Sequence, residues 1–171
     1  MTAIVILIDK DGYCLLTKRA NGKKDAWVFP GGGIDPGETP IIAAQRELKE
    51  EAGADITLEN LVPLCLHESD FDLKAILSQE PGKFYKHNLA IFYIGILTDK
   101  TKDSVQLALQ KEEVADSQWV HINDLLKIVD NSFENKPKEL KHLIGKYPNE
   151  YGQGISDKHA RAIKLIANYL L

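Results

Sequence analysis

Short runs of apolar residues, separated by polar turns, dominate the first part of the chain. Residues 3–8 and 13–18 are two such runs, and the segment between them contains Asp-Gly, a pair typical of tight hairpin turns. A third run at 26–29 ends at Pro30 and three consecutive glycines. Runs of this length bounded by turn residues favour strands. We therefore predict three strands, the first two joined as a hairpin.

A helical pattern follows the glycines after a short polar loop. Thr39 is a residue type that caps helices, and Pro40 would occupy the first helical position, where its missing N–H costs nothing. Gly53 is a typical residue just beyond a helix end. The sequence thus predicts a helix over 40–52. Its apolar stripe, which we expect to face the core, consists of Ile41, Ala44, Leu48 and Ala52.

The rest of the chain alternates apolar runs with polar connections. The run at 88–97 is almost entirely apolar, as expected of a central strand buried on both faces. The polar stretch at 67–86 predicts an insertion, either a loop or a hairpin. The polar stretch at 98–117 predicts a connection between two elements. The other predicted elements are a strand pair or one bent strand over 56–66, a strand over 118–122 and a helix starting at 123.

The tail repeats apolar residues at helical spacing. This stripe predicts a C-terminal helical segment within about 138–171 that packs on the rest of the chain. No stretch has the composition of a linker, so we expect a single α/β domain over residues 1–171. The stripe consists of Ala160, Ile163, Ile166, Ala167 and Leu170.

Composition narrows the class without pointing to a function. Of the 171 residues, 44% are hydrophobic and 27% charged, which excludes a disordered or membrane-spanning chain. A net charge of −4, from 21 basic and 25 acidic residues, supplies no global field for nucleic acid or an anionic membrane. Cys14 and Cys65 lie in apolar stretches without CxxC spacing, which favours reduced core residues. The first apolar run is too short for a signal peptide or a membrane span. We therefore expect a cytoplasmic protein.

Three carboxylates gather on the predicted helix. At about 100° per residue, Glu47, Glu50 and Glu51 fall within one arc at the border of the apolar stripe. Like charges at this spacing destabilise a helix by a few tenths of a kcal/mol per pair, and the C-terminal half of a helix disfavours anions. A solvated acidic face is one interpretation. The other is a cation site, and hard oxygen ligands suit Mg²⁺ or Mn²⁺.

The glycines before the helix support the second interpretation. Gly31, Gly32, Gly33 and Gly37 predict a flexible loop whose backbone can approach a ligand or a metal closely. The spacing of Gly32 and Gly37 imitates a phosphate-binding P-loop, but an acidic side chain at residue 38 stands where that motif needs lysine. Direct cradling of a phosphate is thus disfavoured, and binding through a metal stays open.

Read as one string, these residues resemble the signature of the Nudix hydrolases. The match is Gly32-x5-Glu38-x7-Arg46-Glu47-Leu48-x-Glu50-Glu51-x-Gly53-Ala54. Every fixed residue type stands at its spacing, and the one departure is Ala54 in place of a larger aliphatic residue. The flanking segments 27–31 and 112–120 also look like the family. The resemblance implies an α/β/α sandwich with a central mixed sheet.

The same resemblance implies how the site residues divide their roles. Glu47, Glu50 and Glu51 would hold the metal together with the backbone carbonyl of Gly31, while Glu38 and Arg46 would form a supporting ion pair. Glu113, six residues before Trp119, would add a ligand or a general base, with Glu112 as its competitor. Both could equally be solvated loop charges. Either Glu51 or Glu113 could accept the proton of the attacking water, with Glu50 beside them in the catalytic group.

Candidate substrate contacts are less sharply defined. Arg19, Lys23 and Lys24 could contact outer phosphates, although an exposed loop explains the two lysines as well. An aromatic side chain could stack on a nucleobase, and His87 could line the same pocket. The five histidines show no zinc-type spacing. The aromatic candidates, each of which could equally be a core residue, are Trp27, Phe29, Phe84, Tyr85 and Tyr93.

The resemblance therefore predicts a Mg²⁺-dependent or Mn²⁺-dependent hydrolase of a nucleoside diphosphate linked to another group. Its partner would be a small nucleotide derivative, with neither nucleic acid nor membrane expected and a homodimer left open. One alternative is a binding module of the same fold that senses a nucleotide, which would not need three clustered acids. Another is an isoprenoid diphosphate isomerase, for which no suitably placed catalytic cysteine is found.

Overall fold

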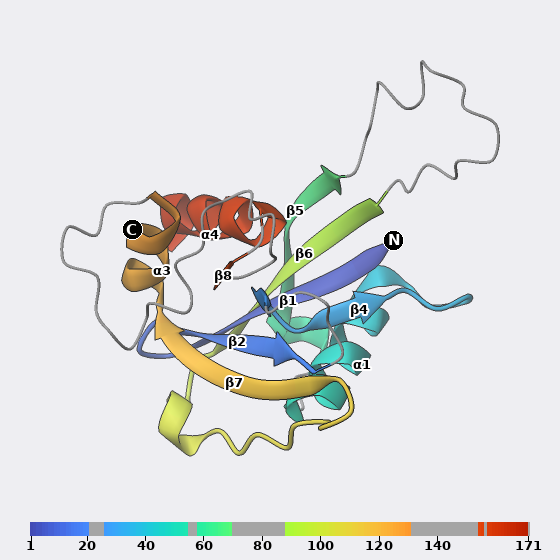
Figure 1. Ribbon diagram of the computed structural model, residues 1–171, viewed down its shortest axis with the longest axis horizontal. Helices are drawn as coiled ribbons and strands as arrows, with labels where there is room; N and C mark the ends of the chain where they lie inside the picture. The colour runs from blue at the N-terminus through green and yellow to red at the C-terminus, as the bar shows by residue number, and fades with distance from the viewer. Residues whose placement is uncertain (21–25, 55–57, 70–87, 131–153, 156, 171) are drawn as a thin grey trace.

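A mixed β-sheet forms the centre of the molecule, as the computed structural model shows (Figure 1). The structure describes residues 1–20, 26–54, 58–69, 88–130, 154–155 and 157–170. Its strands follow the order β5-β6-β1-β2-β3-β8, with β4 on β1 and β7 on β2. The β1–β6 and β3–β8 pairs are parallel and the other pairs are antiparallel. The strands are β1 (Thr2–Asp9), β2 (Tyr13–Arg19), β3 (Ala26–Val28), β4 (Gly31–Gly33), β5 (Leu61–Ser69), β6 (Asn88–Leu97), β7 (Val114–His121) and β8 (Gly154–Ile155).

Helices cover both faces of this sheet. Figure 1 shows α1 (Pro40–Ala52) on one side, and α3 (Ile122–Asp130) and α4 (Asp157–Leu170) on the other. Two short 3₁₀ helices, η1 (Leu58–Asn60) and η2 (Lys102–Ser104), precede β5 and follow β6. This arrangement confirms the α/β class and the α/β/α sandwich with a mixed sheet. No helix in the described ranges is both long and apolar enough to cross a membrane.

The alternation of side chains along β1 builds two separate cores. Ala3, Val5 and Leu7 pack under α1, whereas the intervening isoleucines pack on the face covered by α3 and α4. A strand that is buried on both faces must be apolar at every position, because neighbouring side chains point to opposite faces. The predicted central strand, β6, pairs with β1 in parallel, and its buried Phe92 and Tyr93 belong to the two different cores, although Ile96 near its end is exposed.

Local signals placed α1 correctly. The helix begins at Pro40, and Gly53 ends it with a left-handed backbone (φ 68°) and donates its N–H to the Lys49 carbonyl. Thr39 is the capping residue by position, but its hydroxyl makes no capping hydrogen bond. The predicted apolar stripe is also confirmed at Ala44, Leu48 and Ala52, with Ile41 only partly buried.

Three expectations need correction. The glycine segment 31–33 is not a free loop but strand β4, held by pairing with β1. Strand β7 begins at Val114 rather than at 118, because its first residues pair with the end of β2 although they are mostly polar and exposed. Strand β5 extends to Ser69 and bears an irregularity at Pro63, so the polar stretch predicted from residue 67 starts later.

The tail helix is confirmed as α4 over the part of the segment that the structure describes. Ile163 and Ile166 are fully buried and belong to the core beneath α3 and α4. The rest of the predicted helical segment before 154, and residues 70–87 of the predicted insertion, lie outside the described residues. Cys14 is buried, Cys65 is partly buried and both are free thiols.

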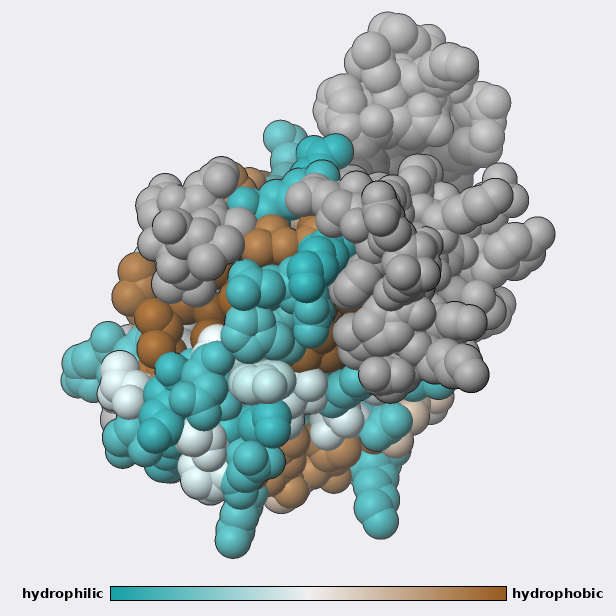
Figure 2. Space-filling view, turned by 90° about the vertical axis from the view of Figure 1, so that its left-hand side faces the viewer, coloured by the Kyte–Doolittle hydropathy of each residue, from teal (hydrophilic) through white to brown (hydrophobic). Residues whose placement is uncertain are grey.

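The outer surface carries a few isolated apolar side chains. On the side shown in Figure 2, the described surface alternates between hydrophilic and hydrophobic areas. Over the described residues, the large apolar side chains with the greatest exposure come from several different elements, so they do not gather on one helix or one strand. They are Met1, Ile42, Val62, Leu66, Ile96 and Leu165.

Candidate active site

The site is built on the face of α1 that borders the sheet. Glu47 and Glu51 lie one helical turn apart, so both side chains project from the same face. Both residues are buried, with 8% and 6% of their surface exposed. Glu50, between them in sequence, points further outward, and 47% of its side chain is exposed. The sequence therefore placed three carboxylates on one arc, and the fold buries only two of them.

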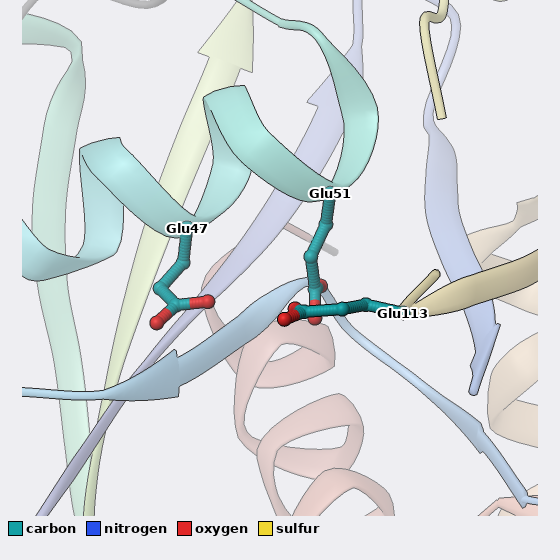
Figure 3. Close-up of side chains that lie close together, drawn as sticks. All are labelled: Glu47, Glu51 and Glu113. Atoms are coloured by element: carbon teal, nitrogen blue, oxygen red, sulfur yellow. The ribbon is translucent and has the colours of Figure 1, made fainter. Parts of the chain in front are cut away.

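A third carboxylate reaches this pair from a distant part of the sequence. Glu113 immediately precedes β7, and its carbonyl accepts a hydrogen bond from the Ala20 N–H at 2.8 Å. Its own N–H donates to the carbonyl of Gln110, which closes the turn before the strand. Figure 3 shows the side chains of Glu47, Glu51 and Glu113 pointing toward one another, and one oxygen of each lies within 4.8 Å of the others. Tertiary pairing thus joins the predicted late glutamate to the helix pair.

The three carboxylates occupy an electrostatically costly arrangement. Burial, with smaller contributions from the charges of Glu47 and Glu113, raises the pKa of Glu51 to about 7, against a hydrogen bond from Gly31 and the charge of Arg19. Burial also raises the pKa of Glu47, against the hydrogen bond and charge of Arg46. Clustered oxygens of this kind suit a hard divalent cation, which would offset the repulsion. The donor set therefore fits Mg²⁺ or Mn²⁺.

The glycines bring backbone close to the two buried carboxylates. The Gly31 N–H donates to Glu51 Oε2 at 3.0 Å. Gly31 has φ 150°, and a Cβ there would collide with the Ala3 carbonyl and the Ile4 backbone of β1. A Cβ on Gly32 would overlap the carboxylate of Glu47. The predicted close approach is therefore real, although the nearest groups are a strand and carboxylates of this chain.

Arg46 organises a second set of acidic groups beside the cluster. Its Nε donates to Glu38 at 2.8 Å, its Nη1 to Glu47 at 2.9 Å and to Glu50 at 3.0 Å, and its Nη2 to the Gly33 carbonyl at 2.9 Å. These contacts contain the predicted Glu38–Arg46 ion pair. The hydrogen bond from Arg46 lowers the pKa of Glu38, and the hydrogen bond to Glu38 raises that of Arg46. Arg46 thus connects the loop before α1, strand β4 and the helix.

The predicted substrate residues divide into three groups. Arg19, the exposed last residue of β2, pairs with Val114 at a bulge next to Glu113, and its charge acts on Glu51. Trp27, Phe29 and Tyr93 are only 5%, 1% and 6% exposed and belong to the cores, so the expectation of open aromatic faces is not met by these three. Lys23, Lys24, Phe84, Tyr85 and His87 lie outside the described residues. Glu112, the competitor of Glu113, is exposed and does not belong to the carboxylate cluster.

One buried residue beside this region was not singled out from the sequence. His159 of α4 is 2% exposed, and its Nδ1 accepts a hydrogen bond from the N–H of Phe29, two residues before Gly31. The signal that could have found it is its spacing, because His159 lies one turn before Ile163 on the apolar stripe of the tail.

Comparison with known proteins agrees with the fold and the motif. A family model described as the NUDIX domain matches residues 1–143. A protein of Rickettsia canadensis named RNA pyrophosphohydrolase is 31% identical over 125 residues, which cover 73% of this chain and 76% of the relative. The C. elegans Ap4A hydrolase in a binary complex is similar in structure, with a TM-score of 0.59, 21% identity, and 99% and 96% of the two chains covered. The NUDIX domain of Shewanella oneidensis NrtR complexed with ADP ribose has a TM-score of 0.63, 16% identity, and 99% and 87% covered.

Proposed function

The chain belongs to the Nudix family and is a hydrolase of diphosphate linkages in nucleotide-linked compounds, and we propose that Mg²⁺ or Mn²⁺ held by its glutamates serves this reaction. The observation that carries the proposal is the convergence of Glu47, Glu51 and Glu113 within 4.8 Å. Three carboxylates at this distance repel one another unless a cation or protons intervene. The pKa of Glu51 is raised to about 7 mainly by burial, and to a lesser extent by this repulsion.

Two further ligands complete the proposed metal site. Glu50 lies on the same helix face, and its carboxylate could turn from Arg46, now 3.0 Å away, toward a cation. The backbone carbonyl of Gly31 is the second, because the N–H of the same residue already contacts Glu51. A bound divalent cation neutralises charge on a diphosphate and lowers the pKa of bound water. The ligand set that we propose is therefore Gly31, Glu47, Glu50, Glu51 and Glu113.

The residues of the chain then divide the remaining work. We assign proton acceptance from the attacking water to Glu51, because its carboxylate is buried beside both Glu47 and Glu113. Glu113 is the competing base, being exposed and next to Glu51, and Glu50 is the third member of the catalytic group. Arg19 would bind an outer phosphate, since it is exposed and lies beside the carboxylates. Lys24 and Tyr85 remain proposed contacts, whereas for Trp27 its burial favours a packing role.

The proposal is tested with metal-free protein and a panel of diphosphate compounds. The panel contains ADP-ribose, a dinucleoside tetraphosphate and an RNA with a 5′-polyphosphate end. These compounds are chosen because the names of relatives and of similar structures mention ADP ribose, Ap4A and RNA. We expect hydrolysis of at least one compound when Mg²⁺ or Mn²⁺ is added, and none with chelator. Cleavage of the RNA would overturn the expectation, based on the net charge of −4, that nucleic acid is not a partner. Turnover without any divalent cation would remove the metal assignment.

The same panel separates the alternative functions. A binding module would bind a nucleotide without releasing product, and an isomerase would rearrange an isoprenoid diphosphate without consuming water.

The two free cysteines favour a reducing compartment, so we infer a cytoplasmic enzyme. Light scattering in solution would test for the homodimer.

A further inference from the structure

The geometry assigns to His159 the role of a positioning residue. From α4, on the opposite side of the sheet from α1, His159 holds the backbone segment that leads into the proposed metal site. The inference rests on the proposed metal site, because its effect is expressed through Glu51. Its starting point is a single contact between α4 and the segment that follows β3: the N–H of Phe29 donates to Nδ1 of His159 at 3.2 Å. The two residues are 130 positions apart in sequence.

The apolar surroundings of His159 indicate that its hydrogen bond to Phe29, and not packing alone, explains a histidine at this position. The ring is 2% exposed and packs against two aromatic rings, Phe29 at 5.4 Å and Phe92 at 5.6 Å between centroids. A leucine or phenylalanine would fill such a site without the cost of burying a polar ring. Since Nδ1 accepts the hydrogen bond, the ring is neutral and carries its proton on Nε2. Burial, together with the charges of Lys158, Arg19 and His67, lowers the pKa of His159 well below its usual value and so maintains this neutral form.

Three successive residues after β3 are each held by a different element. Phe29 is held by α4 through His159, and the carbonyl of Pro30 accepts from the Val5 N–H of β1 at 2.8 Å. The N–H of Gly31 then donates to Glu51 of α1 at 3.0 Å. The proline between the two N–H groups has a fixed φ, which removes one of the torsions that could absorb a shift of Phe29 before it reaches Gly31. The segment is therefore a short, restricted connection between α4 and a proposed metal ligand.

The consequence of losing the His159 acceptor follows from this connection. The buried N–H of Phe29 would be left without its partner and would shift toward another acceptor. Such a shift would change the direction of the Gly31 N–H, which orients the Glu51 carboxylate, and also the placement of the Gly31 carbonyl. Residues that orient metal ligands in this way affect metal affinity about 10–100-fold.

The test compares three substitutions on α4. His159→Leu removes the acceptor at similar size, and His159→Asn keeps an acceptor close to the position of Nδ1. Ile163→Ala is the matched control, because Ile163 is fully buried in the same core and on the same helix but cannot accept a hydrogen bond from the Phe29 N–H. The measurement is the dissociation constant for Mn²⁺, from electron paramagnetic resonance of free Mn²⁺, without substrate and well below the melting temperature of each variant.

We expect His159→Leu to weaken Mn²⁺ binding about tenfold or more, His159→Asn to restore most of it, and Ile163→Ala to leave it unchanged. Equal Mn²⁺ affinity in the wild type and His159→Leu, or an equal loss in Ile163→Ala, would overturn the inference. If His159→Leu does not fold, His159→Gln replaces it, since its longer side chain displaces the acceptor, and unchanged affinity there counts against the inference. Failure of the wild type to bind Mn²⁺ would instead reject the proposed metal site itself.

Discussion

Two sets of glutamates lie side by side at α1, each with one member from outside the helix, and the fold treats them differently. Glu38 and Glu50 each bind the guanidinium of Arg46, at 2.8 and 3.0 Å, and stay partly open to solvent. Glu51 and Glu113 lie close together, and among the described contacts neither forms an ion pair. Glu47 belongs to both sets, because it lies beside Glu51 and Glu113 and also pairs with Arg46. Arg46 thus balances much of the first set's charge within the chain. The second set keeps an excess of negative charge, which a cation from outside can balance.

The pKa values express the same contrast. The hydrogen bond from Arg46 lowers the pKa of Glu38, whereas burial raises that of Glu51 to about 7. Both residues are glutamates within fourteen positions of the sequence. The residue type therefore does not decide whether a carboxylate supports the fold or accepts a proton; burial and the nearest charges do.

The substitution Glu51→Gln tests the difference between the two sets of glutamates most directly. We expect kcat/KM to fall about 10²–10⁴-fold, because this change removes the proposed base and a metal ligand together. In metal-free protein at pH 8, the melting temperature should stay the same or rise, because the buried charge is gone. Both are measured on one preparation, by product release and by thermal unfolding. A large loss of stability would mean that Glu51 is mainly structural.

Arg46→Gln tests the compensated set. We expect about 10–100-fold weaker activity, since Arg46 orients Glu47 and Glu50. Unlike Glu51→Gln, this change should also lower the free energy of unfolding by about 2 kcal/mol, because it removes charged hydrogen bonds of a largely buried side chain. Chemical denaturation measures the stability. Unchanged stability with lost activity would place Arg46 in direct contact with substrate.

Glu113→Gln, with Glu112→Gln as its control, tests the outermost member of the cluster. An exposed ligand contributes less than a buried one, so we expect about a tenfold loss for Glu113→Gln. The control should retain normal activity, because Glu112 is exposed and outside the cluster. Steady-state rates at several Mg²⁺ concentrations distinguish weakened metal binding from a slower reaction. A loss as great as that of Glu51→Gln would transfer the role of base to Glu113.

The most gradual effect is a pH dependence of stability in metal-free protein. The pKa of Glu51 is about 7 in the folded state and close to 4.5 when unfolded, so the folded state binds more protons between these values. Stability should therefore fall as pH rises from 4.5 to 7, by at most about 3 kcal/mol from this residue. Unfolding of wild type and Glu51→Gln across that range isolates the difference. A wild-type curve parallel to that of the variant would show that Glu51 is not perturbed.

Local sequence patterns predicted much of the fold and the part of the site that lies on α1. Helix α1 and its ending at Gly53 depend on residues within about fifteen positions, so local patterns predict them, and the family resemblance implied the Glu38–Arg46 pair. Strand β4 was mistaken for a loop because three glycines carry no apolar signal; only pairing with β1 makes them a strand. The start of β7 was missed for a similar reason, since its exposed polar residues are strand because β2 lies beside them.

By itself, the sequence determined which helix carries the acids, because periodicity and spacing along one element predict it. The same spacing carried the resemblance to the family, and the resemblance in turn implied the sandwich fold. Only the tertiary structure decided that Glu47 and Glu51 are buried while Glu50 binds Arg46, and that Glu113 joins them. It also brought His159 to Phe29 from the other layer. Burial, and contacts between residues far apart in sequence, arise when separate elements pack, and no local pattern encodes which elements will meet.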